Sequence, residues 1–305
     1  MEKNNDSNYR TFGYALNKNV FVNYIEIKAR RIKNFLSEKP EFFQEMVPLK
    51  INYCFEGRCE LILKNGEATY IDSDEFGVDT DSASSDSDAF YYPQGIYKGI
   101  EIVIYDDGDM EKGLPFSKKV RNAVEYLLEE CRERQAPVVQ KADNLIKGCM
   151  VNIKNDLTLS QQKEILIMDV CKVLLILSET DYRDISRRIY YSSSQVRIAR
   201  KTLEILTKNL SKRYSARELA EGFGISETSL KNYFRGVYGK GYSEMLTDIR
   251  MQKAAELLIE DENSISQISE SVGFSTQSRF GSAFKKYFGE TPLEYKRKFM
   301  IDTYE

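Results

Sequence analysis

The sequence predicts an α+β protein in three parts: a β-rich part over residues 1–113, a helical part over 114–199 and an all-α part over 200–305. In the first part, short β-branched and aromatic runs are separated by turn signals. In the second, apolar residues recur at helical spacing. In the third, one unit of helix, turn and helix occurs twice, at 215–239 and 264–289.

Strands are predicted from short runs in the first part. INYCFE, CELILK and EATYI follow one another from Ile51, with turn signals at Gly57 and at Asn65-Gly66. Asn-Gly between such runs is a strong hairpin signal. AFYYP and GIEIVIY predict further strands. Short strands joined by tight turns favour a small sandwich or barrel.

The stretch from Asp72 to Asp88 is acidic and serine-rich, which predicts a solvated loop. A calcium loop is the alternative, but the spacing lacks the EF-hand glycine and final glutamate. Tyrosines of this part are candidates for an effector pocket, since aromatic residues hold ligands in barrel mouths. Packing in the core accounts for them about as well. The candidates are Tyr53, Tyr70, Tyr91 and Tyr92.

Two helices are predicted in the second part. KKVRNAVEYLLEECRER, at 118–134, is amphipathic, and LSQQKEILIMDVCKVLLILSE, at 159–179, is apolar around most of its circumference. A helix that is apolar on all sides must be buried, either within the subunit or across a homodimer interface. The segment from Tyr190 to Ala199 is the predicted linker to the third part.

The repeat of the third part has clear helix signals. Ser-x-x-Glu and Ser-x-x-Gln capping boxes begin the first helix of each copy, at Ser215 and Ser264, and Thr291 begins a third box. Gly224 and Gly273 supply the backbone freedom for the turn within each copy. The unit is a helix-turn-helix, a motif that places its second helix in the DNA major groove.

Apolar pairs fix which side of each second helix is exposed. Leu230 and Phe234 are four residues apart, as are Phe280 and Phe284, so each pair lies on one helix face and enters the core. The outward residues are the candidate DNA contacts: Thr228, Lys231, Asn232 and Arg235 in the first copy, and Gln277, Ser278, Ser282, Lys285 and Lys286 in the second.

These outward residues differ in what they can recognise. Lys231 can donate to guanine acceptors and Asn232 can pair with adenine. Gly281 and Ser282 are small, so the second helix is expected chiefly to hold the DNA backbone. Simple solubility is the alternative for each polar residue. Between the copies, residues 242–260 predict a helix of roughly 28 Å, which can set two recognition helices about one DNA turn apart.

Charge is divided unevenly along the chain. Residues 200–305 hold 17 Lys and Arg against 15 Asp and Glu, while the whole chain has 44 against 47. The last part is therefore +2 and the preceding residues −5. Basic residues nevertheless gather on the second helices and the last helix, where they can contact phosphates.

Residues from about 201 to 300 resemble the DNA-binding domain of the AraC/XylS family of bacterial transcription regulators. The resemblance implies an N-terminal cupin-like sandwich or barrel that senses an effector, and dimerisation through helices beside it. The residues that carry it include Leu219, Leu230, Phe234, Gly239, Arg250, Ala254, Ile268, Gly273, Phe280, Phe284, Gly289, Pro292 and Tyr295.

The sequence therefore predicts a sequence-specific DNA-binding transcription regulator, controlled by an effector bound to its N-terminal part. Its expected partners are promoter DNA, a small-molecule effector, a second copy of the chain and, for an activator, RNA polymerase. Control by a protein partner is one alternative. A DNA-repair enzyme with an attached DNA-binding domain is another, and it requires an activated cysteine, typically in a metal site. A scaffold that uses the helical repeat to bind partners other than DNA is the third.

The amino-acid composition excludes several classes of catalytic and metal site. The chain has no histidine, which excludes His-dependent triads and His-ligated metals. Its five cysteines are scattered, which predicts reduced thiols in a cytoplasmic protein. We find no signal peptide and no apolar run long enough to span a bilayer. No catalytic residue, metal or cofactor is predicted.

Overall fold

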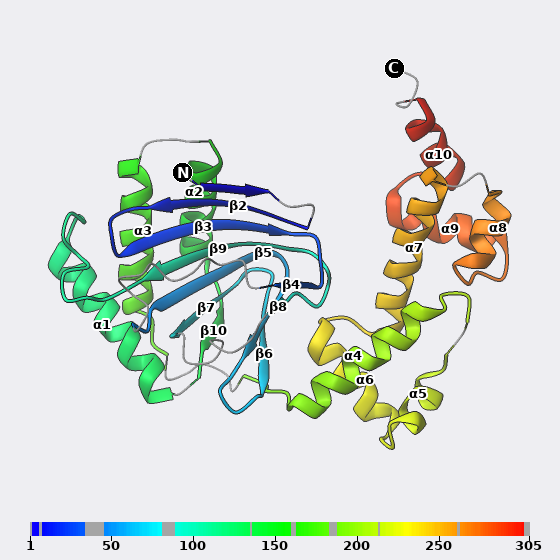
Figure 1. The fold of residues 1–305 in the computed structure, drawn as a ribbon, viewed down its shortest axis with the longest axis horizontal. Coiled ribbons are helices and arrows are strands. Elements are labelled where there is room, and N and C mark those ends of the chain that lie inside the picture. The colour runs from blue at the N-terminus through cyan, green and yellow to red at the C-terminus, as the bar shows by residue number, and fades with distance from the viewer. Residues whose placement is uncertain are drawn as a thin grey trace. The chain divides into compact units, whose positions relative to one another are not determined.

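The computed structural model describes residues 2–5, 8–33, 46–80, 89–134, 136–159, 163–182, 188–212, 214–260 and 263–301. The chain divides into two compact units, Met1–Ser193 and Ser194–Glu305. The first contains an antiparallel sheet with helices and the second is helical (Figure 1). The predicted α+β class, with a β-rich N-terminal and an all-α C-terminal region, is confirmed.

The strands of the first unit form one large sheet and one small one. They are β1 (Glu2–Asn5), β2 (Tyr9–Ala15), β3 (Val20–Ile27), β4 (Arg31–Lys33), β5 (Leu49–Ile62), β6 (Ala68–Asp72), β7 (Glu75–Thr80), β8 (Ala89–Tyr91), β9 (Tyr97–Ile104) and β10 (Val138–Lys141). The large sheet has the order β1-β2-β3-β9-β5-β7-β10, with β6 on β5, and β4 pairs with β8. No ladder between described strands joins β1 to β10, so the predicted cupin-like barrel is not confirmed.

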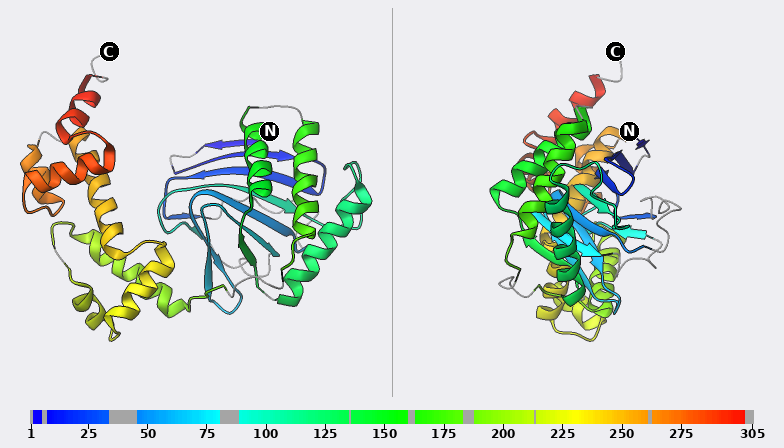
Figure 2. Two further views of the ribbon diagram at one scale, coloured as in Figure 1. Left: turned by 180° about the vertical axis from the view of Figure 1, so that it is seen from behind. Right: turned by 90° about the vertical axis from the view of Figure 1, so that its left-hand side faces the viewer.

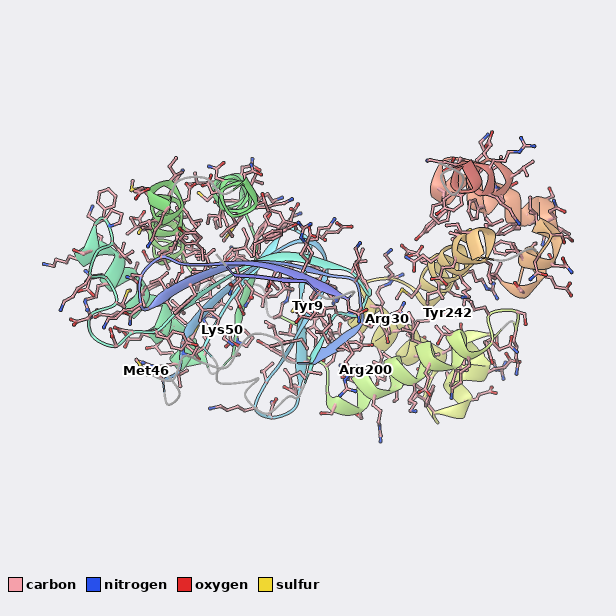
Figure 3. All side chains as sticks on the ribbon, turned by 45° about the horizontal axis from the view of Figure 1, so that its top comes forward. Tyr9, Arg30, Met46, Lys50, Arg200 and Tyr242 are labelled. Carbon is pink, nitrogen blue, oxygen red and sulfur yellow. The ribbon has the colours of Figure 1, made fainter. Side chains whose placement is uncertain are left out.

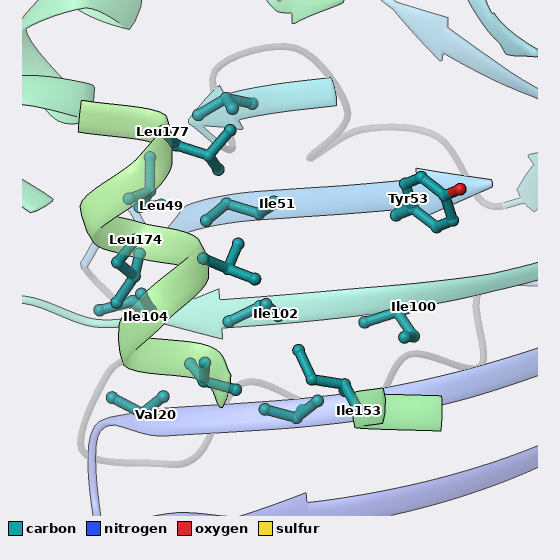
Figure 4. Close-up of a cluster of buried hydrophobic side chains, with 14 of the residues drawn as sticks. Val20, Leu49, Ile51, Tyr53, Ile100, Ile102, Ile104, Ile153, Leu174 and Leu177 are labelled. Atoms are coloured by element: carbon teal, nitrogen blue, oxygen red, sulfur yellow. The ribbon is translucent and has the colours of Figure 1, made fainter. Parts of the chain in front are cut away.

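Helices cover one face of the large sheet. They are α1 (Ser117–Arg134), α2 (Asn144–Leu159) and α3 (Lys163–Ser178). Figure 2 shows α2 and α3 lying over this face. Alternate residues of the central strands point toward them, because successive side chains of a strand face opposite sides. The resulting core includes Ile51, Ile100, Ile102, Ile153, Leu174 and Leu177, all at most 1% exposed (Figure 4).

The opposite face of the sheet packs in a second, smaller core. Ile25 from β3 and Cys54 from β5 meet Tyr92 and Tyr97 from the chain around β8 and β9. All four are at most 3% exposed. The sheet is therefore buried on both faces over part of its area.

The strand predictions are right at some turns and wrong at others. The Asn65-Gly66 hairpin is confirmed, since β5 and β6 pair around it and Gly66 has a φ of +80°. The turn predicted at Gly57 is wrong, because β5 runs through it with an irregularity between Cys54 and Glu56. A Cβ at Gly57 would meet the Ile96 carbonyl oxygen at 2.1 Å, so close backbone approach explains this glycine.

Three segments differ from the sequence prediction. Residues 75–80 of the predicted acidic loop form β7, where Phe76 and Val78 are each 1% exposed; residues 81–88 lie outside the described residues. β10 interrupts the region predicted as helical. The predicted linker is helical from Ser193 onward. β7 is not predicted from the sequence because its apolar residues lie among acidic ones.

Helix α3 is only partly buried, contrary to its nearly uniform apolar sequence. Leu174 and Leu177 are fully buried against the sheet. Ile165 and Met168 on its other side are 45% and 48% exposed. The predicted burial is thus correct for one side within the chain, and the homodimer alternative for the other side stays a prediction.

The second unit consists of helices joined by short turns. They are α4 (Ser193–Lys208), α5 (Ala216–Gly222), α6 (Glu227–Tyr238), α7 (Tyr242–Glu260), α8 (Ile265–Ser271), α9 (Gln277–Phe288) and α10 (Pro292–Ile301). The two predicted helix-turn-helix units are α5–α6 and α8–α9. In the described part of the chain, no helix combines the length and apolar content needed to cross a membrane.

Candidate nucleic-acid interface

The first helix-turn-helix unit is fixed at its helix ends by side-chain caps. The Ser215 hydroxyl accepts from the Glu218 backbone N–H, and the Glu218 carboxylate accepts from the Ser215 backbone N–H, which is the predicted capping box. Ser226 caps α6 by accepting from the Ser229 N–H. Gly239 ends α6 in the left-handed region, with a φ of +71°. These caps set where α6 begins and ends.

The second unit repeats this arrangement. Ser264 and Gln267 form the predicted capping box at α8, and Thr276 caps α9. Gly289 ends α9 with a φ of +83°. The third predicted box is also present. The Thr291 hydroxyl accepts from the Glu294 backbone N–H, and the Glu294 carboxylate accepts from the Thr291 backbone N–H. Both recognition helices have 12 residues and the same kinds of ends.

The facing of both recognition helices is as predicted. Leu230 and Phe234 of α6 are 1% and 0% exposed. Phe280 and Phe284 of α9 are both 0% exposed, and their rings are 5.6 Å apart at 60°. Because these pairs hold one side of each helix in the core, the other side must face solvent.

The exposed side of α6 carries all four residues predicted for this helix. Thr228, Lys231, Asn232 and Arg235 are exposed. The Lys231 ammonium lies 2.5 Å from the Glu227 carboxylate one turn earlier. This pair raises the pKa of Lys231, chiefly through the hydrogen bond. Because the pair is solvent-exposed, it contributes little to stability and can open when another acceptor approaches.

The exposed side of α9 is more basic and less bulky. Lys285 and Lys286 lie in its last turn, and Arg279 in its first half is also exposed. A Cβ at Gly281 would meet nothing within 4 Å among the described residues beyond the helix's own backbone. The exposed surface of α9 therefore lacks a side chain at Gly281, between Arg279 and the two lysines of the last turn. The predicted contacts on α9 are all exposed: Gln277, Ser278, Ser282, Lys285 and Lys286.

An arginine outside both recognition helices contacts the turn at Gly273, between α8 and α9. Arg250 of α7 donates from Nε and from a terminal guanidinium nitrogen to the Leu210 carbonyl oxygen, at 3.0 and 2.7 Å. The turn at Gly273 packs against it, and a Cβ there would lie 2.3 Å from the same carbonyl. In the sequence, Arg250 stands out only as one of the residues that carry the family resemblance. Its role could not be seen because Leu210 is 40 residues away in sequence.

Helix α7 connects the two units with the predicted bounds. It has 19 residues, a length of about 28 Å. Leu246, Met251 and Leu258 are buried at successive levels along it, so it packs against neighbours over its whole length. A continuous helix of this kind is a rigid connector. The separation of one DNA turn between the recognition helices stays a prediction.

The four candidate effector tyrosines lie in different places in the first unit. Tyr91 and Tyr92 line one cavity on the sheet face opposite the helices. Tyr53 packs instead in the core between sheet and helices, with its ring 4.8 Å from that of Phe55. The Tyr70 hydroxyl donates to Glu60 at 2.9 Å. The structure thus brings only two of these four together at one cavity.

The cysteines bear on the repair-enzyme alternative. All five are free thiols, and four of them are buried. Burial raises the pKa of Cys54 and of Cys131 to about 12, and that of Cys171 to about 11. Thiols with raised pKa values are poor nucleophiles at neutral pH. These positions therefore lack the activation that an alkyl-acceptor cysteine needs.

Comparisons with known proteins agree with the helical repeat. Residues 219–298 match a family model described as a helix-turn-helix domain. Transcriptional activator AggR of Escherichia coli is 32% identical over 157 residues, covering 50% of this chain and 58% of that protein. HTH-type transcriptional activator CfaD of Escherichia coli is 28% identical over 126 residues, covering 41% of this chain and 47% of that protein.

The chain is also similar to a solved structure. The C-terminal domain of AraT, a response regulator from Geobacillus stearothermophilus, is 36% identical and covers 33% of this chain and 84% of the solved one, with a TM-score of 0.32. The chain spans about half the length of the curated relatives it matches. Both of these relatives are named as transcriptional activators, which agrees with the prediction of a regulator rather than an enzyme.

Proposed function

We propose that this chain, whose residues 219–298 match a helix-turn-helix domain model, is a sequence-specific DNA-binding transcription regulator that acts as an activator. The observation that carries the proposal is the matched pair of recognition helices. In α6 and α9, a buried apolar pair fixes the inner side, and the outer side presents polar and basic side chains. Helices presented in this way can enter the major groove.

The two helices are proposed to divide the recognition of DNA. On α6, Lys231 and Asn232 read base edges, since ammonium and amide groups match guanine and adenine. On α9, Lys285 and Lys286 contact phosphates, which position the protein without specifying sequence. Gln277 is the base-reading candidate of α9. Thr228, Arg235, Ser278 and Ser282 complete the proposed contact set.

Control is proposed to reside in the first unit. An effector bound there would change the affinity of the second unit for promoter DNA, with a coupling free energy of about 1–3 kcal/mol. We propose further that two copies associate through the exposed side of α3, where Ile165 and Met168 lie. As an activator, the DNA-bound regulator would engage RNA polymerase in the cytoplasm.

Gel-shift titrations of the full chain and of residues 194–305 test the proposal. The second unit has its own core, with Phe234 and Phe284 fully buried, so the fragment should fold and bind DNA. Specific binding should exceed nonspecific binding by about 10³-fold or more and weaken with salt. Equal affinity for all sequences would contradict sequence-specific regulation.

The same fragment separates sensing from binding. Cell extract containing the effector should change promoter affinity for the full chain and leave the fragment unaffected. A response retained by the fragment would contradict control through the first unit. A response that disappears after proteolysis of the extract would favour the alternative of a protein partner.

A further inference from the structure

A cavity lies on the sheet face opposite the helices of the first unit. Its volume is about 60 Å³, and β5, β7, β8 and β9 contribute to its lining. A single buried water needs at least about 10–15 Å³ of such space. The cavity can therefore hold a ligand of a few non-hydrogen atoms without rearrangement.

Strand register gathers charged groups at this cavity. Lys50 of β5 pairs directly with Asp79 of β7, and Asn52 of β5 pairs with Glu101 of β9. All four line the cavity (Figure 3 labels Lys50), because their strand neighbours face the helices. Asp79 and Glu101 are 9% and 5% exposed, and Glu60, also in the lining, is 7% exposed. The described lining thus sets three carboxylates against one ammonium.

Aromatic rings form the other wall. Tyr92 and Tyr97 are each 3% exposed, and their ring centroids are 5.0 Å apart. Phe90 and Tyr91 extend this wall. Burial, followed by the nearby Cys59 and Glu101, raises the pKa of Tyr92 and Tyr97 well above the usual value, so both phenols stay neutral. The neutral rings can attract a cation to their faces.

We infer that this cavity binds a small organic cation of the primary alkylammonium class and that this cation is an effector of the protein. The effector role rests on the proposed function, whereas binding itself does not. A carboxylate ligand would meet three groups of like charge. An ammonium ligand would be attracted by those carboxylates and by the aromatic wall, both in a site of low dielectric.

Ligand-detected NMR on the full chain tests binding, with ethylammonium chloride as the probe, sodium acetate as the anionic control and potassium chloride holding ionic strength constant. A ligand of three non-hydrogen atoms is expected to bind no tighter than roughly 1 mM. Saturation transfer to ethylammonium but not to acetate is expected. Transfer to acetate alone, or to neither, would overturn the inference.

Two variants of similar size are expected to change the affinity for ethylammonium in opposite directions. Glu101→Gln removes one carboxylate and should weaken ethylammonium binding at least tenfold, whereas Lys50→Met removes the competing ammonium and should strengthen it. Glu133→Gln, on the exposed part of α1, should change nothing. Shifts of the same sign for the two cavity variants, or none, would contradict the assignment. Should Glu101→Gln lose its wild-type circular dichroism, Asp79→Asn provides the charge-removing variant.

The DNA readout separates this inference from the proposed function. If ethylammonium binds with the predicted signs but leaves promoter affinity unchanged, the cavity assignment stands and the effector role falls. If ethylammonium does not bind while cell extract still alters promoter affinity, the cavity assignment falls and effector control stands.

Discussion

The two helix-turn-helix units share a frame but carry different surfaces. Both recognition helices have 12 residues, a hydroxyl N-cap, a left-handed glycine at the C-terminus and a buried pair four residues apart. Helix α6 presents Glu227, Lys231 and Arg235, a formal charge of +1. Helix α9 has no acidic residue and presents Arg279, Lys285 and Lys286, a formal charge of +3.

This difference shows that burial constrains only half of each helix. The inner half must keep its apolar pair for the unit to fold, whereas the outer half can change without affecting the core. In α6 the outer half has long polar side chains near its centre, and in α9 it has Gly281 and Ser282 there. The proposed division between base reading and phosphate binding follows from that contrast.

The largest effect should come from the shared core and be similar in both units. Phe234→Ala and Phe284→Ala each remove a fully buried ring and should lower the free energy of unfolding by about 3–5 kcal/mol. Urea denaturation of each variant measures this. DNA binding should fail through unfolding; a Phe284→Ala protein that unfolds like wild type yet binds no DNA would show that Phe284 is a contact residue.

The next effect concerns the positive charge of α9. Replacing both Lys285 and Lys286 by alanine should reduce the slope of log affinity against log salt by about 2 and weaken binding to all sequences alike. Titrations at several salt concentrations on specific and random duplexes measure it. An altered base preference with an unchanged slope would mean that these lysines read bases.

Gly281→Ala should stabilise the second unit by about 1 kcal/mol, because glycine is unfavourable inside a helix and the added methyl meets no described neighbour. Thermal denaturation detects this change, with Ser282→Ala as the matched control on the next position. A lower melting temperature would indicate that Gly281 approaches another part of the molecule closely.

The smallest effect is expected at the ion pair of α6. Glu227→Gln removes the partner of Lys231, and stability should hardly change because the pair is solvent-exposed. DNA affinity should rise, since one negative charge leaves the interface. A weaker affinity for specific DNA at unchanged stability would show that Glu227 itself contacts a base.

The two helix-turn-helix units could be predicted from sequence almost completely, whereas the start of α4 lies in the predicted linker. Their signals are local: each capping box spans four residues, and the Leu230–Phe234 and Phe280–Phe284 spacings span one helical turn. Helix bounds therefore agree within a few residues. The bracing of Gly273 by Arg250 and the Leu210 carbonyl was missed, because it joins residues far apart in sequence.

The first unit was predicted less well because sheets depend on nonlocal pairing. The Asn65-Gly66 hairpin was found, since its signal is local. Strands β2 and β3 were not predicted, because β3 is held by pairing with a strand far along the chain, with Tyr24 opposite Ile100. The polar row at Lys50, Asn52 and Glu101 was invisible in sequence, because only the register of β5, β7 and β9 brings these residues to one cavity.

Selection from a randomised DNA library tests the division between the two recognition helices most directly. Wild type, Lys231→Ala/Asn232→Ala and Gln277→Ala/Ser282→Ala should be compared at one salt concentration. The α6 double variant should lose base preference at its contacted positions, at a cost of about 1–3 kcal/mol for each lost specific pair, while the α9 double variant keeps most of the preference. An unchanged preference and affinity in the α6 variant, or a larger loss in the α9 variant, would contradict the account.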